Sequence, residues 1–214
     1  MTVGRKAKGN IPAERDVRER LMEVATGLFA RKGYAATTTR EIVAAAGVTK
    51  PVLYYYFRSK EGIYLELMQR AFKRFEEVVE DSINASGRAE EKLLRLCDQV
   101  FSLIVEKIDV VRLMYSIYYG PPQGAPFFDF DAVHLKLYES ILRIINEGIR
   151  KREFRKGRSE DMAWAILGAV HIIMENELCH PERELGHDGL RRILDLAFRG
   201  ISIRTGRPGK GGKK

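Results

Sequence analysis

The chain has 214 residues, of which 45% are apolar and 31% are charged. This composition supports a sizeable hydrophobic core and excludes general disorder. Its two cysteines, Cys97 and Cys179, lie in sequence surroundings without metal-ligand spacing, which excludes a disulfide scaffold and indicates reduced thiols in a cytoplasm.

No targeting or membrane-spanning segment is expected. The first fifteen residues are basic and polar, so we expect no signal peptide and no export by that route. The most apolar stretch, residues 162–174, is shorter than the about 20 residues that a membrane span requires. We expect it to form a buried helix.

The net charge of +8 is concentrated at the two ends of the chain. Residues 1–60 hold twelve Lys and Arg against five Asp and Glu, and residues 201–214 hold five basic residues and no acidic one. The middle is therefore acidic, with a net charge of −4. This segregation predicts a polyanionic partner for the N-terminal part, nucleic acid before membrane. We expect residues 1–14 to be a flexible basic arm and residues 204–214 to be a disordered basic tail whose extra attraction for DNA stays an open alternative.

The first two predicted elements are amphipathic helices with recognisable ends. Apolar residues at helical spacing follow Pro12, and Gly33 ends this first helix. The second helix is capped by Thr38, with Glu41 three residues later completing a capping box, and it ends at Gly47. It is about two turns long.

A third helix follows the second after a tight turn. Thr49 is its expected N-cap, which places Lys50 and Pro51 in the first turn, where a missing backbone N–H breaks no helical hydrogen bond. Two short helices joined by a tight turn that contains glycine describe a helix-turn-helix. In this motif the N-terminal residues of the second helix enter the DNA major groove.

The run of three tyrosines in the third helix covers about 200° of its surface, so the three rings cannot all face one core. Leu53 and Phe57, four residues apart, mark the buried stripe. The outward and flanking positions are Lys50, Pro51, Val52, Tyr54, Tyr55 and Tyr56. A flanking tyrosine can rest its ring on the protein and send its hydroxyl to a phosphate. The alternative is that Tyr54 or Tyr55 belongs to the core.

Ser59 is the expected cap of a fourth helix, with Lys60 in its first turn. A free lysine beside the backbone N–H groups of a helix N-terminus is a candidate phosphate clamp. The alternative is a solvated lysine with no partner.

Residues 15–68 resemble the DNA-binding domain of the TetR/AcrR family of bacterial transcriptional regulators. The resemblance rests on Gly-Tyr at 33–34, Thr-Thr-x-Arg-Glu-Ile at 37–42, Gly-Val-Thr-Lys at 47–50, Leu-Tyr-x-x-Phe at 53–57 and Ser-Lys-Glu at 59–61. It implies phosphate contacts from Thr38, Thr39, Tyr54, Tyr56 and Lys60, a phosphate or base contact from Arg40, and base-edge contacts from Lys50, Pro51, Val52 and Tyr55, with Thr49 beginning the same surface.

The base preference cannot be transferred from the family. Valine at 52 stands where threonine is frequent, and Tyr55 and Tyr56 stand where histidines are common. On the family's geometry, Lys50 can donate to guanine O6 and N7, and Val52 can contact a thymine methyl group.

The remainder of the chain shows helical patterns and no strand pattern, which predicts an all-α protein of about nine helices. We expect the DNA-binding domain at residues 15–62 and a helical effector-binding and dimerisation domain at 63–203. The resemblance implies a homodimer formed by the last two long helices. The apolar segment "WAILGAVHIIM" supports this, although burial in the core of one chain is an alternative.

The resemblance also implies a cavity for a small-molecule effector in the second domain. Its candidate lining is mostly aromatic, as in drug-sized pockets: Met114, Tyr115, Tyr118, Tyr119, Phe127, Phe128, Phe130, His134, Trp164 and His171. Ordinary core packing is the alternative for each of them. His171 and Glu175 have no third ligand in the pattern, so we predict no metal and no cofactor.

The expected function is a cytoplasmic, sequence-specific repressor that leaves a palindromic double-stranded operator when a small apolar or aromatic effector binds. An enzyme or small-molecule carrier is the first alternative, but the sequence has no Gly-rich phosphate loop, nucleophile elbow or supported catalytic triad. A nonspecific DNA-compacting protein is the second, because both termini are basic.

Overall fold

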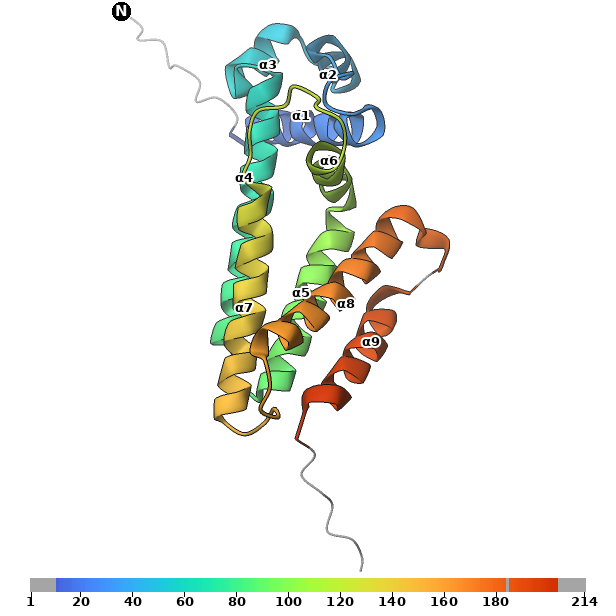
Figure 1. Ribbon diagram of the computed structural model, residues 1–214. Helices are drawn as coiled ribbons and strands as arrows, with labels where there is room; N and C mark the ends of the chain where they lie inside the picture. Colours follow the sequence, from blue (N-terminus) through green and yellow to red (C-terminus); the bar gives the residue numbers. More distant parts are fainter. Residues whose placement is uncertain (1–10, 184, 204–214) are drawn as a thin grey trace, which may run out of the picture. The chain divides into compact units, whose positions relative to one another are not determined.

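The structure, a computed structural model, describes residues 11–183 and 185–203. In these residues it contains nine α-helices, one short 3-10 helix and no strand, which confirms the all-α prediction (Figure 1). The predicted tail, residues 204–214, and most of the predicted arm lie outside the described residues. Residues 11–14, predicted as part of the arm, instead belong to the first helix, α1, which begins at Ile11.

The chain divides into two compact units. Of the described residues, unit 1 comprises those up to Ala71 together with Asp109–Phe128, and unit 2 comprises Phe72–Ile108 and those from Asp129 onward. This division differs from the predicted boundary between residues 62 and 63. The segment 109–128 joins the first unit, although the sequence pattern assigned it to the effector domain.

Unit 1 is formed by α1 (Ile11–Lys32), α2 (Thr39–Ala45), α3 (Lys50–Phe57), the first half of α4 (Lys60–Asn84), and α6 (Ile108–Tyr118). We call residues 16–71 the head. Every helix of the head contributes buried apolar residues to the core of unit 1. They include Leu21, Ala25 and Phe29 of α1, Ile42 of α2, Leu53 and Phe57 of α3, and Ile63 of α4. Burial of this core fixes the angle at which α3 leaves α2.

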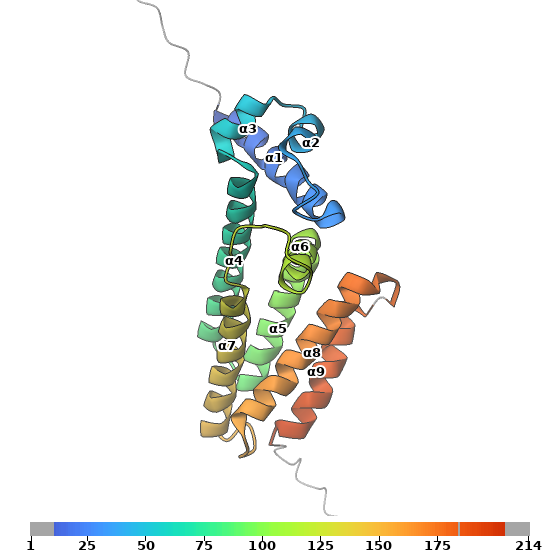
Figure 2. The same ribbon diagram turned by 45° about the horizontal axis from the view of Figure 1, so that its top comes forward.

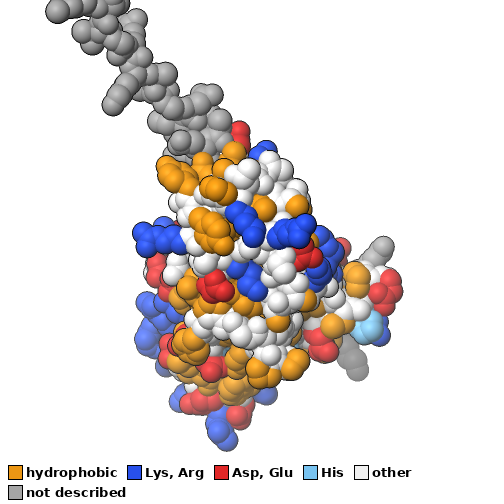
Figure 3. All heavy atoms as spheres, turned by 90° about the horizontal axis from the view of Figure 1, so that it is seen from above, with side chains coloured by type: hydrophobic (Ala, Val, Ile, Leu, Met, Phe, Trp, Pro, Cys, Tyr) orange, Lys and Arg blue, Asp and Glu red, His pale blue; other side chains and the backbone are white. Residues whose placement is uncertain are grey.

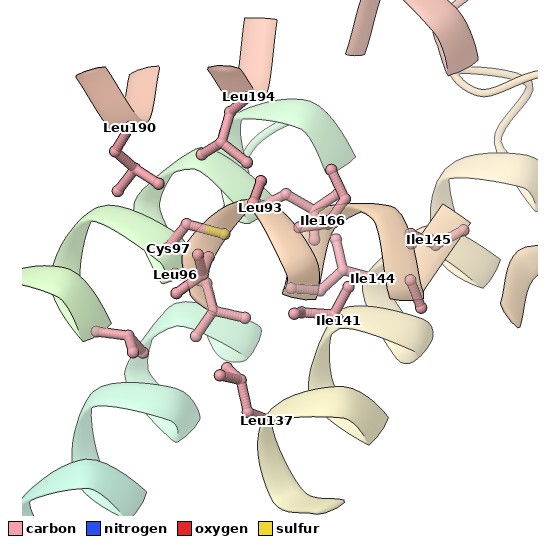
Figure 4. Close-up of a cluster of buried hydrophobic side chains, with 14 of the residues drawn as sticks. Leu93, Leu96, Cys97, Leu137, Ile141, Ile144, Ile145, Ile166, Leu190 and Leu194 are labelled. Carbon is pink, nitrogen blue, oxygen red and sulfur yellow. The ribbon is translucent and has the colours of Figure 1, made fainter. Parts of the chain in front are cut away.

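Unit 2 is a helical bundle formed by the second half of α4 with α5 (Ala89–Glu106), α7 (Phe130–Arg150), α8 (Ser159–Cys179) and α9 (Gly186–Ile201). A 3-10 helix, Pro181–Arg183, follows α8. α7 packs against α8, and α8 packs against α9 (Figure 2). Figure 4 shows side chains from α5, α7, α8 and α9 meeting in one hydrophobic cluster, among them Leu96, Ile144, Ile166 and Leu194.

One ion pair lies largely inside this bundle. The Lys92 ammonium of α5 donates to both carboxylate oxygens of Glu147 on α7, at 3.2 and 3.1 Å, and to the carbonyl of Ile83. Lys151 and Lys92 lower the pKa of Glu147, because both donate to its carboxylate. The bundle thus keeps a charged link between two helices at the edge of its apolar core.

The start of α7 differs from the sequence prediction because the side chain of Asp129 caps this helix. The long apolar pattern after residue 126 predicts a helix over about 127–152, but α7 begins at Phe130 and ends at Arg150. Asp129 precedes it, and its Oδ1 accepts a hydrogen bond from the Ala132 amide at 3.0 Å. A carboxylate at this position satisfies an N–H group that has no partner within the helix.

The buried helix predicted around residues 162–174 is α8, which has 21 residues. By length and composition alone it could cross a membrane, and it is the one such helix among the described residues. Core helices of globular proteins meet the same criterion. One face of α8, including Ile166, Val170 and Ile173, lies in the hydrophobic cluster of unit 2.

Candidate nucleic-acid interface

The N-terminus of α2 is closed by the predicted capping box. Thr38 Oγ1 accepts from the Glu41 amide at 3.2 Å, and Glu41 Oε2 accepts from the Thr38 amide at 2.9 Å. Lys32, at the end of α1, pairs with the same carboxylate. The lysine, together with the Thr38 amide and hydroxyl, holds the pKa of Glu41 at about 2. An anionic group therefore already occupies this helix terminus.

The Thr38 hydroxyl, which was predicted to contact a phosphate, is already hydrogen-bonded in this capping box. The Thr38 hydroxyl donates to Glu41 Oε2 at 3.0 Å while it accepts the Glu41 amide. Both of its hydrogen-bonding functions are thus used in the capping box. Thr39 and Arg40 are the first two residues after this cap. Thr39 is half-buried and Arg40 is exposed.

The N-terminus of α3 is different, because no side chain closes it. Thr49 is the N-cap, as predicted, but its side chain makes no capping hydrogen bond. Pro51 lies in the first turn, also as predicted, and that turn contains no acidic residue. An uncapped helix N-terminus carries partial positive charge that attracts a phosphate. Because Pro51 has no N–H and the Val52 amide donates to the Thr49 carbonyl at 3.1 Å, the Lys50 amide is the N–H of this turn that a phosphate could use. Of the two helices in the motif, α3 is therefore the one prepared to accept an anion.

The outward face of α3 matches the prediction from its helical wheel. Leu53 and Phe57 are buried, whereas Lys50 and Pro51 are exposed. The Tyr54 side chain is 47% exposed and that of Tyr55 is 75% exposed, so the alternative that either ring belongs to the core is wrong. Val52 and Tyr56 are half-buried. Seen from above the head, Lys and Arg side chains lie among hydrophobic ones, the class that includes tyrosine (Figure 3).

The tyrosine rings support one another. The rings of Tyr55 and Tyr56 meet edge to face, with their centroids 5.0 Å apart. The ring of Tyr56 also lies 6.4 Å from that of the buried Phe57. This chain of contacts anchors an exposed ring to the core and limits the orientations of Tyr55. A ring that is already ordered loses less conformational entropy when it contacts a ligand.

Lys60 does not have the free side chain that the phosphate-clamp hypothesis assumed, nor is it the solvated lysine of the alternative. Its ammonium donates to the carbonyls of Tyr34 and Thr37, both at 3.0 Å. It also lies 4.1 Å from the centroid of the Tyr34 ring. Lys60 therefore ties the first turn of α4 to the turn between α1 and α2, and any phosphate contact would use its remaining N–H.

The sequence pattern did not identify Arg58 as part of this surface. Arg58 is exposed at the C-terminal end of α3. Its backbone has a φ of +63°, a conformation that residues other than glycine rarely adopt. Strained backbone of this kind occurs preferentially at functional sites. Its guanidinium adds a positive charge beside the tyrosines, and we add it to the candidate interface.

A second group of predicted residues, the candidates for effector binding, is distributed over both units. Met114, Tyr115, Tyr118, Tyr119, Phe127 and Phe128 belong to unit 1, and Phe130, His134, Trp164 and His171 belong to unit 2. In unit 1, the ring of Tyr119 lies 5.2 Å from that of Tyr115 and 4.7 Å from that of Tyr118. In unit 2, the rings of His134 and His171 are 6.5 Å apart.

Four of these candidates are not enclosed by the single chain. The exposed fraction is 87% for Phe127, 61% for Tyr119, 60% for Trp164 and 40% for Tyr118. Trp164 lies on the outward face of α8 and its ring is 4.9 Å from that of Tyr138. Phe130, in contrast, is buried. Within residues 11–183 and 185–203, no group of three or more His, Cys, Asp or Glu side chains is arranged to hold a metal ion.

Comparison with known proteins agrees with these features. Residues 21–67 match the bacterial regulatory proteins of the tetR family. Among curated proteins, the chain is 27% identical over 158 residues to the HTH-type transcriptional repressor KstR2 of Mycobacterium tuberculosis, covering 70% of this chain and 75% of that protein.

Solved structures agree on the fold. The TetR family transcriptional regulator PfmR of Thermus thermophilus superposes with a TM-score of 0.69 at 24% identity, covering 84% of this chain and 97% of that one. The structure of a SmeT–triclosan complex has a TM-score of 0.69 at 18% identity, covering 93% and 98%.

Proposed function

We propose, since the chain belongs to the TetR family of transcriptional regulators, that it is a dimeric repressor released from a palindromic operator by a small apolar or aromatic effector. The observation that carries this proposal is the outward face of α3. This face presents an uncapped helix N-terminus, an exposed lysine and two exposed tyrosines on a helix whose other face is buried.

Each side chain on this face has a chemical role in the proposal. Lys50, in the first turn of α3, enters the major groove and donates to guanine O6 and N7. Val52 contacts a thymine methyl group, and Pro51 and Tyr55 lie against base edges. The hydroxyls of Tyr54 and Tyr56, with the backbone N–H of Lys50 at the N-terminus of α3, bind phosphates and fix the orientation of the helix.

Residues outside α3 complete the proposed contact. Thr39 and Arg40 approach the DNA from the start of α2, where the closed capping box leaves Arg40 as the main cation. Arg58 adds a phosphate contact at the other end of α3. Positive charge at both ends of the reading helix would hold it along the groove, because phosphates of both strands border the groove.

An outward stripe on α8 and α9 supports the dimer. Trp164, Gly168 and Ile172 follow one another at four-residue spacing on the exposed face of α8. Leu196 and Gly200 do the same on α9. A Cβ added at Gly168 or at Gly200 would meet no atom within 4 Å. Exposed apolar side chains beside glycines suit a close contact between helices of two chains. The dimer would place two α3 helices about 34 Å apart in successive major grooves.

The effector part of the proposal rests on the aromatic residues at the C-terminal end of α6 and just after it, and on the comparisons. Tyr115, Tyr118 and Tyr119 form a cluster of rings that suits an apolar or aromatic ligand. SmeT, which has the same fold, has been solved with triclosan, and KstR2 is a repressor. The ligand would act by binding more tightly to a conformer in which the α3 helices have the wrong separation. We place this activity in the cytoplasm, where the DNA is.

The test compares two lysine variants on two kinds of DNA. Lys50→Ala should weaken binding to the DNA upstream of the protein's own gene by about 5-fold to 150-fold, because a good base contact contributes about 1–3 kcal/mol to discrimination. The loss on random DNA of the same length should be smaller. The matched control is Lys73→Ala, a lysine of α4 in unit 2, which should leave both affinities unchanged. Equal losses for Lys50→Ala on the two DNAs would contradict base reading by α3.

A further inference from the structure

The segment that follows α6 reaches back to the end of α1 through one side chain. Gln123 Oε1 accepts a hydrogen bond from the backbone amide of Tyr34 at 2.8 Å. Its Nε2 donates to the carbonyl of Ser116 at 3.0 Å and approaches the Ser116 hydroxyl at 3.4 Å. One amide group therefore joins the last turn of α6 to the turn between α1 and α2, and all three residues lie within unit 1.

The backbone at the end of α1 has the shape that this approach requires. Gly33 has a φ of +82°, a left-handed conformation that favours glycine. A Cβ added at Gly33 would lie 2.8 Å from Gln123 Oε1. Any larger residue at position 33 would therefore both strain the turn and displace the glutamine. Glycine at position 33 therefore both allows α1 to end and leaves room for Gln123.

Tyr34 also makes contacts with α4. Its carbonyl accepts from Lys60 of α4, and its hydroxyl is 3.3 Å from a carboxylate oxygen of Glu61. The buried ring packs against those of Phe29 and Tyr64. The turn thus has two ties, one to the start of α4 and one to the end of α6. α2 begins only five residues after Tyr34, so the direction of this turn sets the direction of α2 and α3.

We propose that Gln123 is a positioning residue for the head: its amide fixes the α1–α2 turn, and through it the reading helix, relative to the end of α6. The role in DNA binding rests on the function proposed above. Ser116, which accepts the Gln123 amide, lies between Tyr115 and Tyr118, two of the candidate effector residues. A ligand that displaced these rings would move the partner of Gln123, and the displacement would reach α2 without passing along α4.

The first arm of the test measures hydrogen exchange of the Tyr34 amide in the full-length protein. Gln123→Ala removes the acceptor, and the Tyr34 amide should then exchange about tenfold faster, the factor that one hydrogen bond represents. Gln123→Glu keeps an acceptor for this amide and should change its rate by less than about threefold. The control is Gln99→Ala, which removes a glutamine that bonds Ser82 in unit 2 and should leave Tyr34 unchanged. An unchanged Tyr34 rate in Gln123→Ala would overturn the tie.

The second arm measures affinity for the upstream DNA and for random DNA with the same variants. Gln123→Ala should weaken binding to the upstream DNA by about threefold or more, because part of the binding energy must then order the head. Gln99→Ala should not. Faster exchange with unchanged DNA affinity would mean that the tie is structural only, and would overturn the positioning role. If the unmodified protein bound no DNA, the proposed function and the positioning role would fail together, while the exchange rates would still decide whether the tie exists.

Discussion

The ammonium group of Lys60 donates to the carbonyl of Tyr34 at 3.0 Å and lies 4.1 Å from the centre of its ring. This contact holds the first turn of α4 against the α1–α2 turn, so Lys60 stabilises the shape of the surface to which it belongs. We therefore expect Lys60→Ala to lower the free energy of unfolding by about 2 kcal/mol, the usual contribution of hydrogen bonds to a charged group.

Denaturation in urea measures this effect, and Lys50→Ala is its control, because Lys50 is exposed and should change the free energy of unfolding by less than about 0.5 kcal/mol. Lys60→Ala should also weaken binding to the upstream DNA and to random DNA by similar factors, since a distorted head fits no duplex well. A Lys60→Ala protein with unchanged stability would show that its hydrogen bonds to the turn are absent in solution.

The capping box of α2 makes stability depend on pH at its acid end. The pKa of Glu41 is about 2 in the folded chain, below its ordinary value of 4.5, because of Lys32 and Thr38. A depressed pKa means that the contribution is complete above about pH 4.5 and is lost as the pH falls from there through about 2. Glu41→Gln should remove this part of the pH dependence. The midpoint of urea denaturation, measured at several pH values from about 6 to about 2.5, reports this pH dependence. If the midpoint fell equally steeply with pH in both proteins, Glu41 would not be its source.

The hydroxyl of Tyr64 is buried and has no hydrogen-bond partner among the described residues, whereas that of Tyr34 reaches Glu61. Burial raises the pKa of Tyr64 to about 12. An unsatisfied buried polar group costs about 1–3 kcal/mol, so Tyr64→Phe should leave the free energy of unfolding unchanged or raise it by about 1 kcal/mol. Tyr34→Phe, the matched change, should lower it. Thermal denaturation of the two variants gives the comparison, and a clear loss of stability in Tyr64→Phe would point to a partner for its hydroxyl.

The outward stripe of α8 predicts where a single charge prevents dimer formation. Ile172→Glu should give monomers, because it places a carboxylate in the centre of the proposed contact without disturbing the buried face of the helix. Leu135→Glu is the control, since Leu135 is as exposed but lies on α7. Sedimentation equilibrium distinguishes monomers from dimers. If the Ile172→Glu protein were still dimeric, the dimer contact would not be centred on this face of α8.

Much of unit 1 was predictable because its signals are local. The cap at Thr38, the N-cap at Thr49, Pro51 in the first turn and the buried pair Leu53 and Phe57 depend on residues within a few positions of one another. Helical geometry converts such spacings directly into buried and exposed faces. For this reason the outward direction of the tyrosines, and the placement of Lys50 beside them, followed from the sequence.

The ties within unit 1 were not predictable, because each joins residues that are distant in the chain. Lys60 bonds carbonyls 26 and 23 positions earlier, and Gln123 bonds an amide 89 positions earlier. Backbone carbonyls and amides are present at every residue, so no pattern in the sequence identifies the ones that are used. For the same reason the sequence did not indicate that residues 109–128 belong to the same compact unit as the head. Arg58 was missed because nothing in its residue type indicates a positive φ.

In the proposed function, the exposed face of α3 reads a specific DNA sequence. The most direct measurement is the affinity of the full-length protein for its own upstream DNA and for random DNA across a series of salt concentrations. We predict a ratio of about 10³ or more at physiological salt, which is typical of specific binding, with both affinities falling as salt rises. A ratio below about tenfold would indicate a DNA-compacting protein, and the absence of binding to any duplex at low salt would contradict DNA binding by α3.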